Sequence, residues 1–377
     1  MPRIQFQHVA VTGVATCVGP QIRRLEDETQ LYGEHPEQIE KVRRVTGVTT
    51  RVVAPAGVTS LDLCEQAARR LLTEGGSDAA GLDAVVCVTQ TPDFCQPSNA
   101  NLLHGRLGLA KTAAAFDVNQ GCSGWVYGLY LAACMVESGG CERVLLLAGD
   151  TVTQCVNPRD RAVVPLFGDA GTATLVERRT DAAPSWFALH SDGQGWESII
   201  VRAGASRCPR SPATAVERPA EDGSVRSDND LLMNGVEVFN FTLREEPAAV
   251  RELLAFAGVG VEGVDAFVFH QANKLILDTL ALRLKLPREK VPVSTLARFG
   301  NQSSASVPAA LCEALGDRLR QGSLRTVCSA FGVGLSWASC LLTLGPLRVC
   351  AWESYGATFS AARANEEKPP RMEARQA

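Results

Sequence analysis

The sequence predicts an α/β fold built from two similar halves. Apolar, β-branched runs alternate with helix-like stripes in the first half, and the same order returns in the second. Strands separated by helices are typical of sheets with mostly parallel pairing and helices on their faces. A length of 377 residues suits two core-forming units or one large duplicated unit. We therefore expect halves at 1–176 and 177–345, then an extension at 346–377 that is partly disordered.

The elements expected in the first half follow from capping and periodicity. Ser60 can cap a helix that has Asp62 in its first turn and an apolar stripe along one side. The run AVVCVT at 84–89 indicates a strand buried on both faces. The other strands are expected at 9–13, 113–118, 143–149 and 172–176.

The second half repeats this order. Its elements are expected to be a helix at 237–256, a strand at 265–270, helices at 273–284 and 304–318, and strands at 325–330 and 335–342. Each half also contains a glycine-led turn that opens a helix of small residues, GCSGWVYGLYLAAC from Gly121 and GNQSSASVPAALC from Gly300. Such helices pack closely against other backbones, so we expect these two to lie side by side at the centre.

Two segments fall outside the duplicated pattern. Residues 203–230 are rich in proline, serine and charge, and they predict a long mobile loop that gates a site. The end of the chain, at least from Asn365, has the composition of a disordered tail.

Composition argues against several classes of function. A net charge of -4 without a polybasic run gives no nucleic-acid surface. No apolar stretch approaches the roughly 18 to 20 residues that span a bilayer, and the first residues lack the features of a signal peptide. The thirteen cysteines occur singly, with no CxxC pair. We therefore expect a cytoplasmic protein without a membrane association or a metal site.

Cys122 is the strongest candidate for chemistry. It follows a predicted strand through the residues NQG and stands at the first turn of the first small-residue helix. Free N–H groups and the helix dipole favour an anion there, so we expect the thiol to be biased towards thiolate. Flanking glycines at Gly121 and Gly124 allow close approach of a ligand. The simpler interpretation is a small buried hydrophobe, as for most cysteines in such a protein.

A nucleophilic cysteine needs polar partners, and two residues stand in suitable places. His270 ends the apolar strand DAFVF, at the edge where ligands bind in open α/β sheets. Asn301 occupies the duplicated counterpart of Cys122, although a helix cap is the simpler role for it. The other four histidines have no chemical neighbour in the sequence and are expected to be structural.

Six segments together resemble a known family. In order they are FDVNQGCSGWVYGL, LFGDAGTATLV, MNGVEVFNF, FHQAN, RFGNQSSASVPAAL and AFGVGLSW. In spacing and sequence they resemble β-ketoacyl-ACP synthase III of the thiolase superfamily, over about residues 5–345. The resemblance implies the thiolase fold, a duplicated αβαβα five-layered sandwich, and a homodimer.

The resemblance also implies roles for individual residues. Cys122 is placed like the family's acyl-accepting nucleophile, and His270 and Asn301 like the pair that completes the triad. The oxyanion hole would be the backbone N–H groups of Cys122 and Val333.

Further residues match positions that contact the substrate in this family. Arg161 is placed like an arginine near the CoA phosphates, Phe239 like a wall of the tunnel, and Asn273 beside the pantetheine arm. Lys274 stands one residue before the place of an arginine that helps to dock the carrier. Gln96 precedes Pro97-Ser98 where an aromatic residue commonly walls the acyl pocket, which suggests a functionalised acyl chain.

The chain departs from the family at the segment EKVRRVTGV. Lys41 and Val45 stand where a tryptophan and an arginine often hold the adenine of CoA. This favours an ACP-bound donor over acyl-CoA and a specialised biosynthetic pathway over the initiation of ordinary fatty-acid synthesis.

The expected reaction is acyl transfer to Cys122, followed by decarboxylative Claisen condensation with a malonyl thioester, without a metal or redox cofactor. The same triad also suits an acyltransferase that passes the acyl group to an amine or alcohol. A cysteine hydrolase and a non-catalytic partner subunit are less favoured. Protease signatures are absent, which argues against the hydrolase. Partner subunits usually lose the cysteine or the histidine, and this chain has both.

Overall fold

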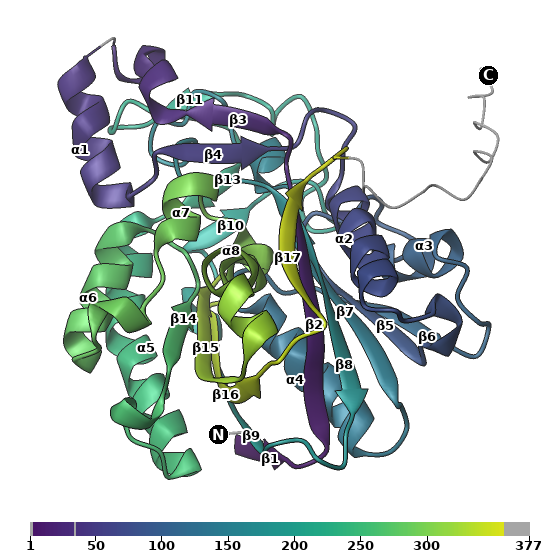
Figure 1. Ribbon diagram of the computed structural model, residues 1–377. Helices are drawn as coiled ribbons and strands as arrows, with labels where there is room; N and C mark the ends of the chain where they lie inside the picture. Colours follow the sequence, from purple (N-terminus) through teal and green to yellow (C-terminus); the bar gives the residue numbers. More distant parts are fainter. Residues whose placement is uncertain (1–2, 34, 358–377) are drawn as a thin grey trace, which may run out of the picture.

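Two β-sheets alternate with three layers of helices in the computed structural model, which describes residues 3–33 and 35–357 (Figure 1). The first sheet, in spatial order, contains β17 (Val349–Ser354), β2 (Val9–Val18), β8 (Ala170–Arg178), β7 (Arg143–Asp150), β5 (Ala84–Val88) and β6 (Ala114–Val118). The second contains β1 (Arg3–Phe6), β9 (Ser185–Ser191), β16 (Ser336–Leu344), β15 (Leu324–Gly332) and β14 (Ala266–Phe269).

The helices form an outer, a central and a second outer layer. Their bounds are α1 (Pro36–Thr46), α2 (Ser60–Glu74), α3 (Asn99–Arg106), α4 (Gly124–Glu137), α5 (Gly235–Ala257), α6 (Lys274–Leu284), α7 (Ser294–Phe299) and α8 (Ser306–Gln321). Helices α2 and α3 cover the first sheet, α5 and α6 cover the second, and α4 and α8 lie between the sheets (Figure 1). This is the duplicated five-layered arrangement expected from the sequence.

Alternation along the strands builds these layers. In β5, Val86 and Val88 pack into the central core with Trp125 of α4, whereas Val85 and Cys87 pack against the α2 side. A strand that is apolar on both faces must be covered on both, so the run AVVCV fixes two helical layers around it. The expected strands and helices are confirmed in order, with shifts of a few residues at element ends, but α1, α7 and β9 were not predicted, and α7 lies in an expected loop.

The expectation of mostly parallel pairing holds in the first sheet, where β17 is also parallel to β2, but fails in the second sheet. Strands β5, β6 and β7 pair in parallel, but β8 is antiparallel to both β7 and β2. In the second sheet β14 and β15 are parallel, whereas β15, β16 and β9 pair antiparallel. A buried strand is apolar on both faces whether it pairs parallel or antiparallel, so the composition of these strands does not indicate the direction of pairing.

The terminal strands cross between the halves. Strand β1 joins β9 in the second sheet, and β17 joins β2 in the first. The expected division into two halves at 176/177 therefore does not apply to β1 and β17, each of which pairs with the sheet of the other half. Strand β17 lies within the extension expected at 346–377, where the sequence analysis placed no element. The tail expected from Asn365 lies outside the described residues.

The structure corrects one local expectation and adds detail to another. The cap of α2 is Thr59, whose hydroxyl accepts from the N–H of Asp62 while the Asp62 carboxylate accepts from the N–H of Thr59, so Ser60 is the first helical residue. The segment 203–230 holds a short hairpin, β11 (Arg218–Pro219) and β12 (Val225–Arg226), fastened by an ion pair from Arg226 to Asp160. The rest of the segment lies in turns and irregular backbone, as expected of a long loop, and its mobility and gating role stay a prediction.

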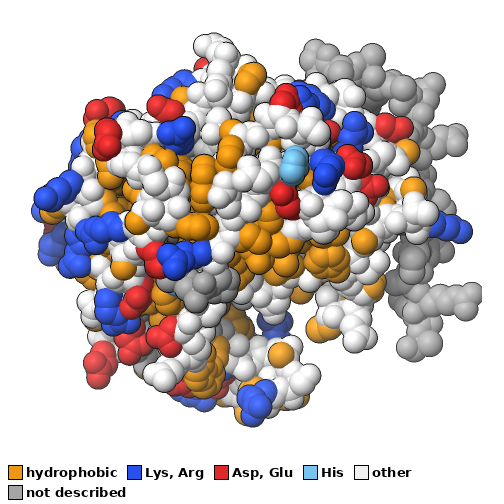
Figure 2. Space-filling model, turned by 90° about the horizontal axis from the view of Figure 1, so that it is seen from below, with side chains coloured by type: hydrophobic (Ala, Val, Ile, Leu, Met, Phe, Trp, Pro, Cys, Tyr) orange, Lys and Arg blue, Asp and Glu red, His pale blue; other side chains and the backbone are white. Residues whose placement is uncertain are grey.

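Smaller elements complete the fold. Strands β3 (Gln21–Arg24) and β4 (Thr50–Val53) form one two-stranded sheet, and β10 (Ile199–Val201) and β13 (Leu231–Met233) form another. Seen from below, the molecule carries a central band of apolar side chains with charged residues around it (Figure 2). Within 3–33 and 35–357, none of the helices has the length and apolarity that a membrane span requires.

Candidate active site

Cys122 lies at the carboxyl end of the first sheet, in the turn between β6 and α4, and its side chain is buried. The end of β15 packs directly against it. A methyl group added at Gly332 would lie 2.6 Å from the Sγ of Cys122 and 2.7 Å from its Cβ, so only glycine lets this backbone approach the thiol.

Two backbone N–H groups lie close enough to the sulfur of Cys122 to lower the pKa of its thiol. They belong to Val333 and to Cys122 itself, and the hydroxyl of Ser303 also donates to the sulfur. Burial, with a smaller contribution from repulsion by Asp150, nevertheless raises the pKa of the Cys122 thiol to about 11, despite the lowering by these three donors. The expected bias towards thiolate is therefore wrong, because desolvation of the buried thiol outweighs the effect of the helix start.

His270 follows β14 and is fully enclosed. Its ring lies edge-on to Phe331, with the two ring centres 5.5 Å apart. The Nδ1 of His270 lies 3.0 Å from the Oγ of Ser306, which accepts at 2.7 Å from the backbone N–H of Gln271. Because this Oγ already accepts a hydrogen bond, we assign its own O–H as the donor to Nδ1 of His270. The ring's own hydrogen is then on Nε2. Burial lowers the pKa of His270 to about 3, so the ring is neutral.

Asn301 is held by its main chain between α7 and α8. Its N–H donates to the carbonyl of Leu166 at 2.8 Å, and its carbonyl accepts from the N–H of Gly168 at 2.9 Å. The Oδ1 of Asn301 accepts from the N–H of Ser303 at 2.9 Å, which orients the carboxamide and leaves its NH₂ as the free donor. Ser303 adopts a φ of 50°, and such a left-handed conformation is typical of functional turns.

Asp150 joins the two halves behind the site. Its buried carboxylate at the end of β7 accepts from the N–H of Gln90, and from both the N–H and the hydroxyl of Ser304. Burial raises the pKa of Asp150 against the lowering by these hydrogen bonds. The carboxylate thus fixes the turn η8 (Ser303–Ala305), which follows Asn301, to the sheet that leads to Cys122.

The structure therefore brings Cys122, His270 and Asn301 to one region. The segment Phe331–Val333 touches Cys122 at one end and His270 at the other. A methyl group added at Gly124, two residues after Cys122, would lie 3.5 Å from the Cβ of Ser304, three residues after Asn301. The starts of helices α4 and α8 and the end of strand β15 thus lie close together.

The predicted substrate-contact residues lie on several different elements of the fold. Asn273 caps α6, and its Oδ1 accepts from the N–H of Ile276 at 2.8 Å. Lys274 is ion-paired with Asp278 along α6. Phe239 is half-buried against the core around α5, and Gln96 is exposed on the turn before α3.

Arg161 lies in the long connection between β7 and β8. Its guanidinium stands over the ring of Tyr32, 5.1 Å from the ring centre, and its carbonyl accepts from the Tyr32 hydroxyl at 2.7 Å. The side chain is therefore held against the segment that precedes α1.

Sequence reasoning missed three residues of the site: Ser306, Asp150 and Gly332. Ser306 was hidden in a helix made largely of small residues, and Asp150 ended a strand run without a motif of its own. The pattern FGVG at 331–334 was a usable signal, because paired glycines at a strand end mark a close backbone approach.

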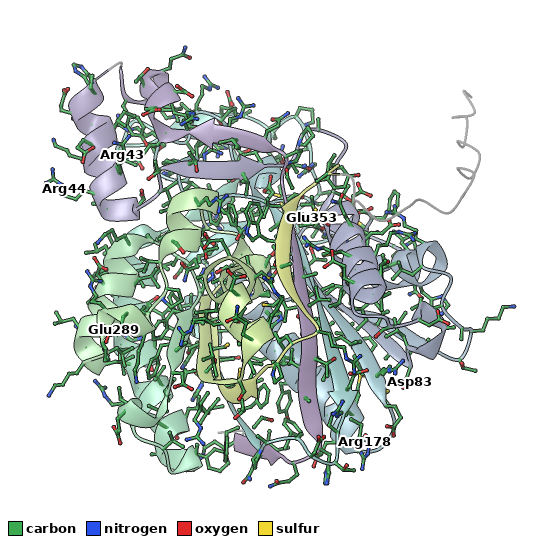
Figure 3. All side chains as sticks on the ribbon, in the orientation of Figure 1. Arg43, Arg44, Asp83, Arg178, Glu289 and Glu353 are labelled. Atoms are coloured by element: carbon green, nitrogen blue, oxygen red, sulfur yellow. The ribbon has the colours of Figure 1, made fainter. Side chains whose placement is uncertain are left out.

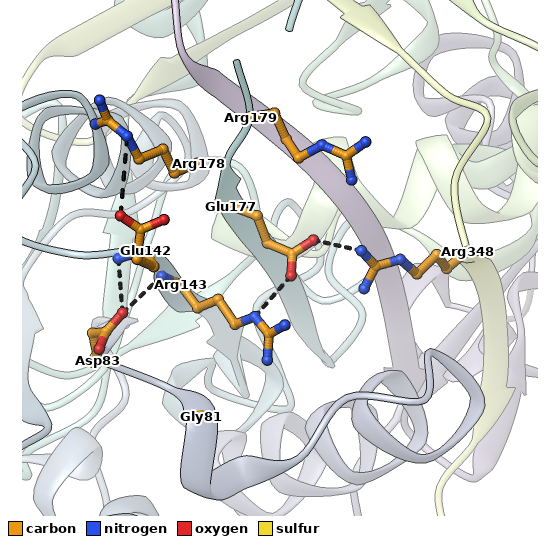
Figure 4. A pocket seen from close by; sticks show the side chains of 8 residues that line it. All are labelled: Gly81, Asp83, Glu142, Arg143, Glu177, Arg178, Arg179 and Arg348. Carbon is orange, nitrogen blue, oxygen red and sulfur yellow. Dashed lines mark hydrogen bonds and ion pairs between the residues drawn. The ribbon is translucent and has the colours of Figure 1, made fainter. Parts of the chain in front are cut away.

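A separate surface hollow of about 360 Å³ lies at the other end of the first sheet (Figure 4). Glu177 bridges Arg143 at 3.0 Å and Arg348 at 2.9 Å there, and Arg178 pairs with Glu142. The charges of this cluster are largely compensated. Among the described residues no group of His, Cys, Asp and Glu is arranged to hold a metal ion.

A duplicated αβαβα sandwich whose two central helices begin beside a buried cysteine and an asparagine defines the class of thiolase-fold enzymes. The family description "3-Oxoacyl-[acyl-carrier-protein (ACP)] synthase III" matches residues 116–194, and its C-terminal counterpart matches residues 254–344. The chain belongs to the β-ketoacyl-ACP synthase III family, an acyltransferase family, and the thiolase fold expected from the sequence is confirmed.

Individual relatives agree with this assignment. A putative 3-oxoacyl-[acyl-carrier-protein] synthase 3 of Campylobacter jejuni is 33% identical over 92% of this chain and 96% of its own length. A solved 3-oxoacyl-(acyl-carrier protein) synthase from Burkholderia xenovorans is 35% identical, with a TM-score of 0.87 over 94% of this chain and 99% of that chain. The priming β-ketosynthase of the R1128 polyketide biosynthetic pathway is 29% identical, with a TM-score of 0.75 over 90% of this chain and 97% of that chain.

Proposed function

We propose that the chain transfers an acyl group from a thioester to Cys122 and condenses it with a malonyl thioester. The observation that carries this proposal is the buried Cys122 at a helix start, with the backbone of Gly332 packed on its sulfur and the N–H groups of Cys122 and Val333 beside it. Donors fixed beside a nucleophile are suited to stabilise the oxyanion that forms when it attacks a carbonyl, typically by about 3 kcal/mol each.

In the first step the Cys122 sulfur attacks the thioester carbonyl, and the tetrahedral oxyanion accepts hydrogen bonds from the N–H groups of Cys122 and Val333. Collapse breaks the bond to the donor thiol, which leaves with the proton that Cys122 gives up. The acyl group remains on the Cys122 sulfur. Because the unliganded thiol is largely protonated, binding of the donor or proton removal during attack has to supply the thiolate.

In the second step a malonyl thioester binds and loses carbon dioxide. The electron pair of the broken C–C bond forms an enolate, whose oxygen is met by the Nε2–H of His270 and the NH₂ of Asn301. The enolate carbon then attacks the acyl group on Cys122, releasing a β-ketoacyl thioester and free Cys122. A neutral imidazole and a carboxamide suit this role because both remain donors at neutral pH.

The carrier proposed for the acyl donor is an acyl carrier protein. The sequence of α1 contains no aromatic residue that could stack on adenine, and Val45 near its end is exposed. Arg44 projects from α1 away from the sheets, and Arg43 lies on the same helix (Figure 3). Arg161, Phe239, Asn273 and Lys274 are proposed to contact the phosphopantetheine arm and the carrier.

We further propose a cytoplasmic homodimer without a metal or redox cofactor that acts in a specialised pathway. Strand β6 ends the first sheet, its residues alternate between exposed and half-buried, and Phe116 on it and Phe94 nearby are both exposed. Such an edge is suited to bury itself against a second copy. The similarity to a polyketide priming ketosynthase supports the specialised pathway.

The test is intact-protein mass spectrometry after incubation with a panel of acyl-ACPs and acyl-CoAs. We expect one acyl adduct on the wild type and none on Cys122→Ala. Addition of malonyl-ACP should remove the adduct and give a product longer by two carbons. Loss of the adduct to an amine or alcohol, with no added carbons, would instead identify the acyltransferase, and failure to form any adduct would contradict both.

A further inference from the structure

Strand β17 lies beyond the residues matched by the family descriptions, which end at Leu344. It pairs in parallel with β2, from Val349 opposite Gly13 to Ser354 opposite Val18. Its carbonyls are also bound by side chains from two helices: Arg70 of α2 donates to Trp352 at 2.9 Å, and Arg320 of α8 donates to Cys350 at 2.7 Å. The strand is therefore an integral part of the fold.

Side chains of β17 alternate between two environments. Val349, Ala351 and Tyr355 pack with the core on the α2 side, and Glu353 of the same parity comes within 3.9 Å of Arg70 of α2; Figure 3 shows Glu353 on the strand. Trp352 has the opposite parity and packs with the small cluster that contains Phe299.

Trp352 is clamped by the last two residues of α7. Its ring meets that of Phe299 at 64°, with centres 4.9 Å apart, and the guanidinium of Arg298 lies 4.4 Å from its centre. Arg298 is itself held 3.6 Å from Glu313 of α8. Gly300 and Asn301 follow Phe299 directly, so Trp352 lies beneath the turn that carries the Asn301 carboxamide.

We propose that Trp352 is a positioning residue for Asn301. Strand β17 thereby holds the end of α7, and with it the Asn301 carboxamide, in place for the condensation step. The proposal rests on the proposed function, in which Asn301 contacts the enolate oxygen. The main chain of Asn301 is fixed on one side by Leu166 and Gly168. Packing of Phe299 on Trp352 fixes the other side. Without Trp352, the end of α7 loses an aromatic neighbour and the shorter of the two cation–π contacts of Arg298, and only its contact with Phe299 is left.

The experiment compares Trp352→Ala with Trp352→Phe, which keeps an aromatic ring. Tyr355→Ala is the matched control, because it removes an aromatic side chain packed on the opposite side of the same segment. We expect Trp352→Ala to acylate Cys122 at the wild-type rate but to condense with malonyl-ACP about tenfold more slowly. Trp352→Phe should recover most of this loss, and Tyr355→Ala should leave the ratio of the two rates unchanged.

Hydrogen–deuterium exchange of full-length protein adds a readout that is independent of activity. Exchange in the segment 299–301 should become faster in Trp352→Ala and stay at the wild-type rate in Tyr355→Ala. Equal loss of acylation and condensation, unchanged condensation, or unchanged exchange in that segment would each overturn the proposal. A wild-type protein that is acylated but never condenses would instead refute the proposed function, even if exchange at 299–301 responds as expected.

Discussion

The Oγ of Ser306 lies 3.0 Å from the Nδ1 of His270 and accepts the backbone N–H of Gln271 at 2.7 Å. One hydroxyl therefore fixes both the orientation and the tautomer of the imidazole. A neutral ring with its hydrogen on Nε2 can donate to an enolate oxygen, whereas the other tautomer presents a lone pair there.

We expect Ser306→Ala to slow condensation by about tenfold or more, since a misplaced tautomer removes a donor worth roughly 1–3 kcal/mol. Acylation of Cys122 should change little, because that step uses the N–H groups of Cys122 and Val333. Ser306→Thr retains the hydroxyl and should recover most of the rate. Single-turnover kinetics of the two steps make the comparison, and parallel losses in both would contradict it.

A second prediction concerns the pH dependence of the free thiol. Burial raises the pKa of Cys122 to about 11 and lowers that of His270 to about 3, so no thiolate–imidazolium pair forms between these values. Only the thiolate reacts with iodoacetamide. The rate of Cys122 alkylation should therefore rise about tenfold per pH unit from pH 7 to pH 9.

Alkylation sites are followed by peptide mass spectrometry, with Cys122→Ala as the control for other cysteines. A rate that is flat over this range would mean that the thiol is already ionised at neutral pH.

The third prediction concerns Glu246, a fully buried carboxyl of α5 that the proposed chemistry does not use. Its Oε1 is bonded by the hydroxyl of Ser329, and its Oε2 has no hydrogen-bond partner. Burial raises the pKa of Glu246 from 4.5 to about 8, against the lowering by Ser329. The unfolded chain releases this proton near pH 4.5 and the folded chain only near pH 8, so the free energy of unfolding falls as pH rises between these values.

We expect Glu246→Gln to match the wild type at about pH 4.5 and to be more stable by roughly 2 kcal/mol at about pH 8, because an amide has no proton to lose. Chemical denaturation at several pH values measures the difference. Glu245→Gln, on the exposed side of the same helix, is the control and should keep the wild-type slope. Equal slopes for Glu246→Gln and the wild type would show that the carboxyl is ionised in the folded state.

The positions of Cys122, His270 and Asn301 could be predicted from the sequence because each follows a strand end or opens a small-residue helix. Local pattern is sufficient there. The pKa of Cys122 could not be predicted, since it depends on the packing of Gly332 against the sulfur and on the hydrogen bond from Ser303, and both residues come from the other half of the chain.

Other features depended on contacts between distant segments. Strand β17 could not be recognised from its own sequence, because its extended conformation depends on pairing with β2. The antiparallel direction of β8 could not be predicted either, because a buried strand has the same apolar pattern whichever way it runs. The tautomer of His270 depends on Ser306, thirty-six residues further along the chain. These features follow from tertiary packing, which periodicity does not encode.

The last prediction tests the close approach of β15 to the nucleophile. In Gly332→Ala the new methyl group would lie 2.6 Å from the Sγ and 2.7 Å from the Cβ of Cys122, closer than van der Waals contact allows. Because Cys122 is buried, the thiol must shift away from the N–H of Val333, and we expect acylation to fall by about a hundredfold or more. Gly322→Ala is the matched control, since a methyl group there meets no atom within 4 Å. It should acylate at the wild-type rate. Circular dichroism establishes that both variants are folded, and a folded Gly332→Ala that still acylates normally would show that the N–H groups beside the sulfur do not determine the rate of the first step.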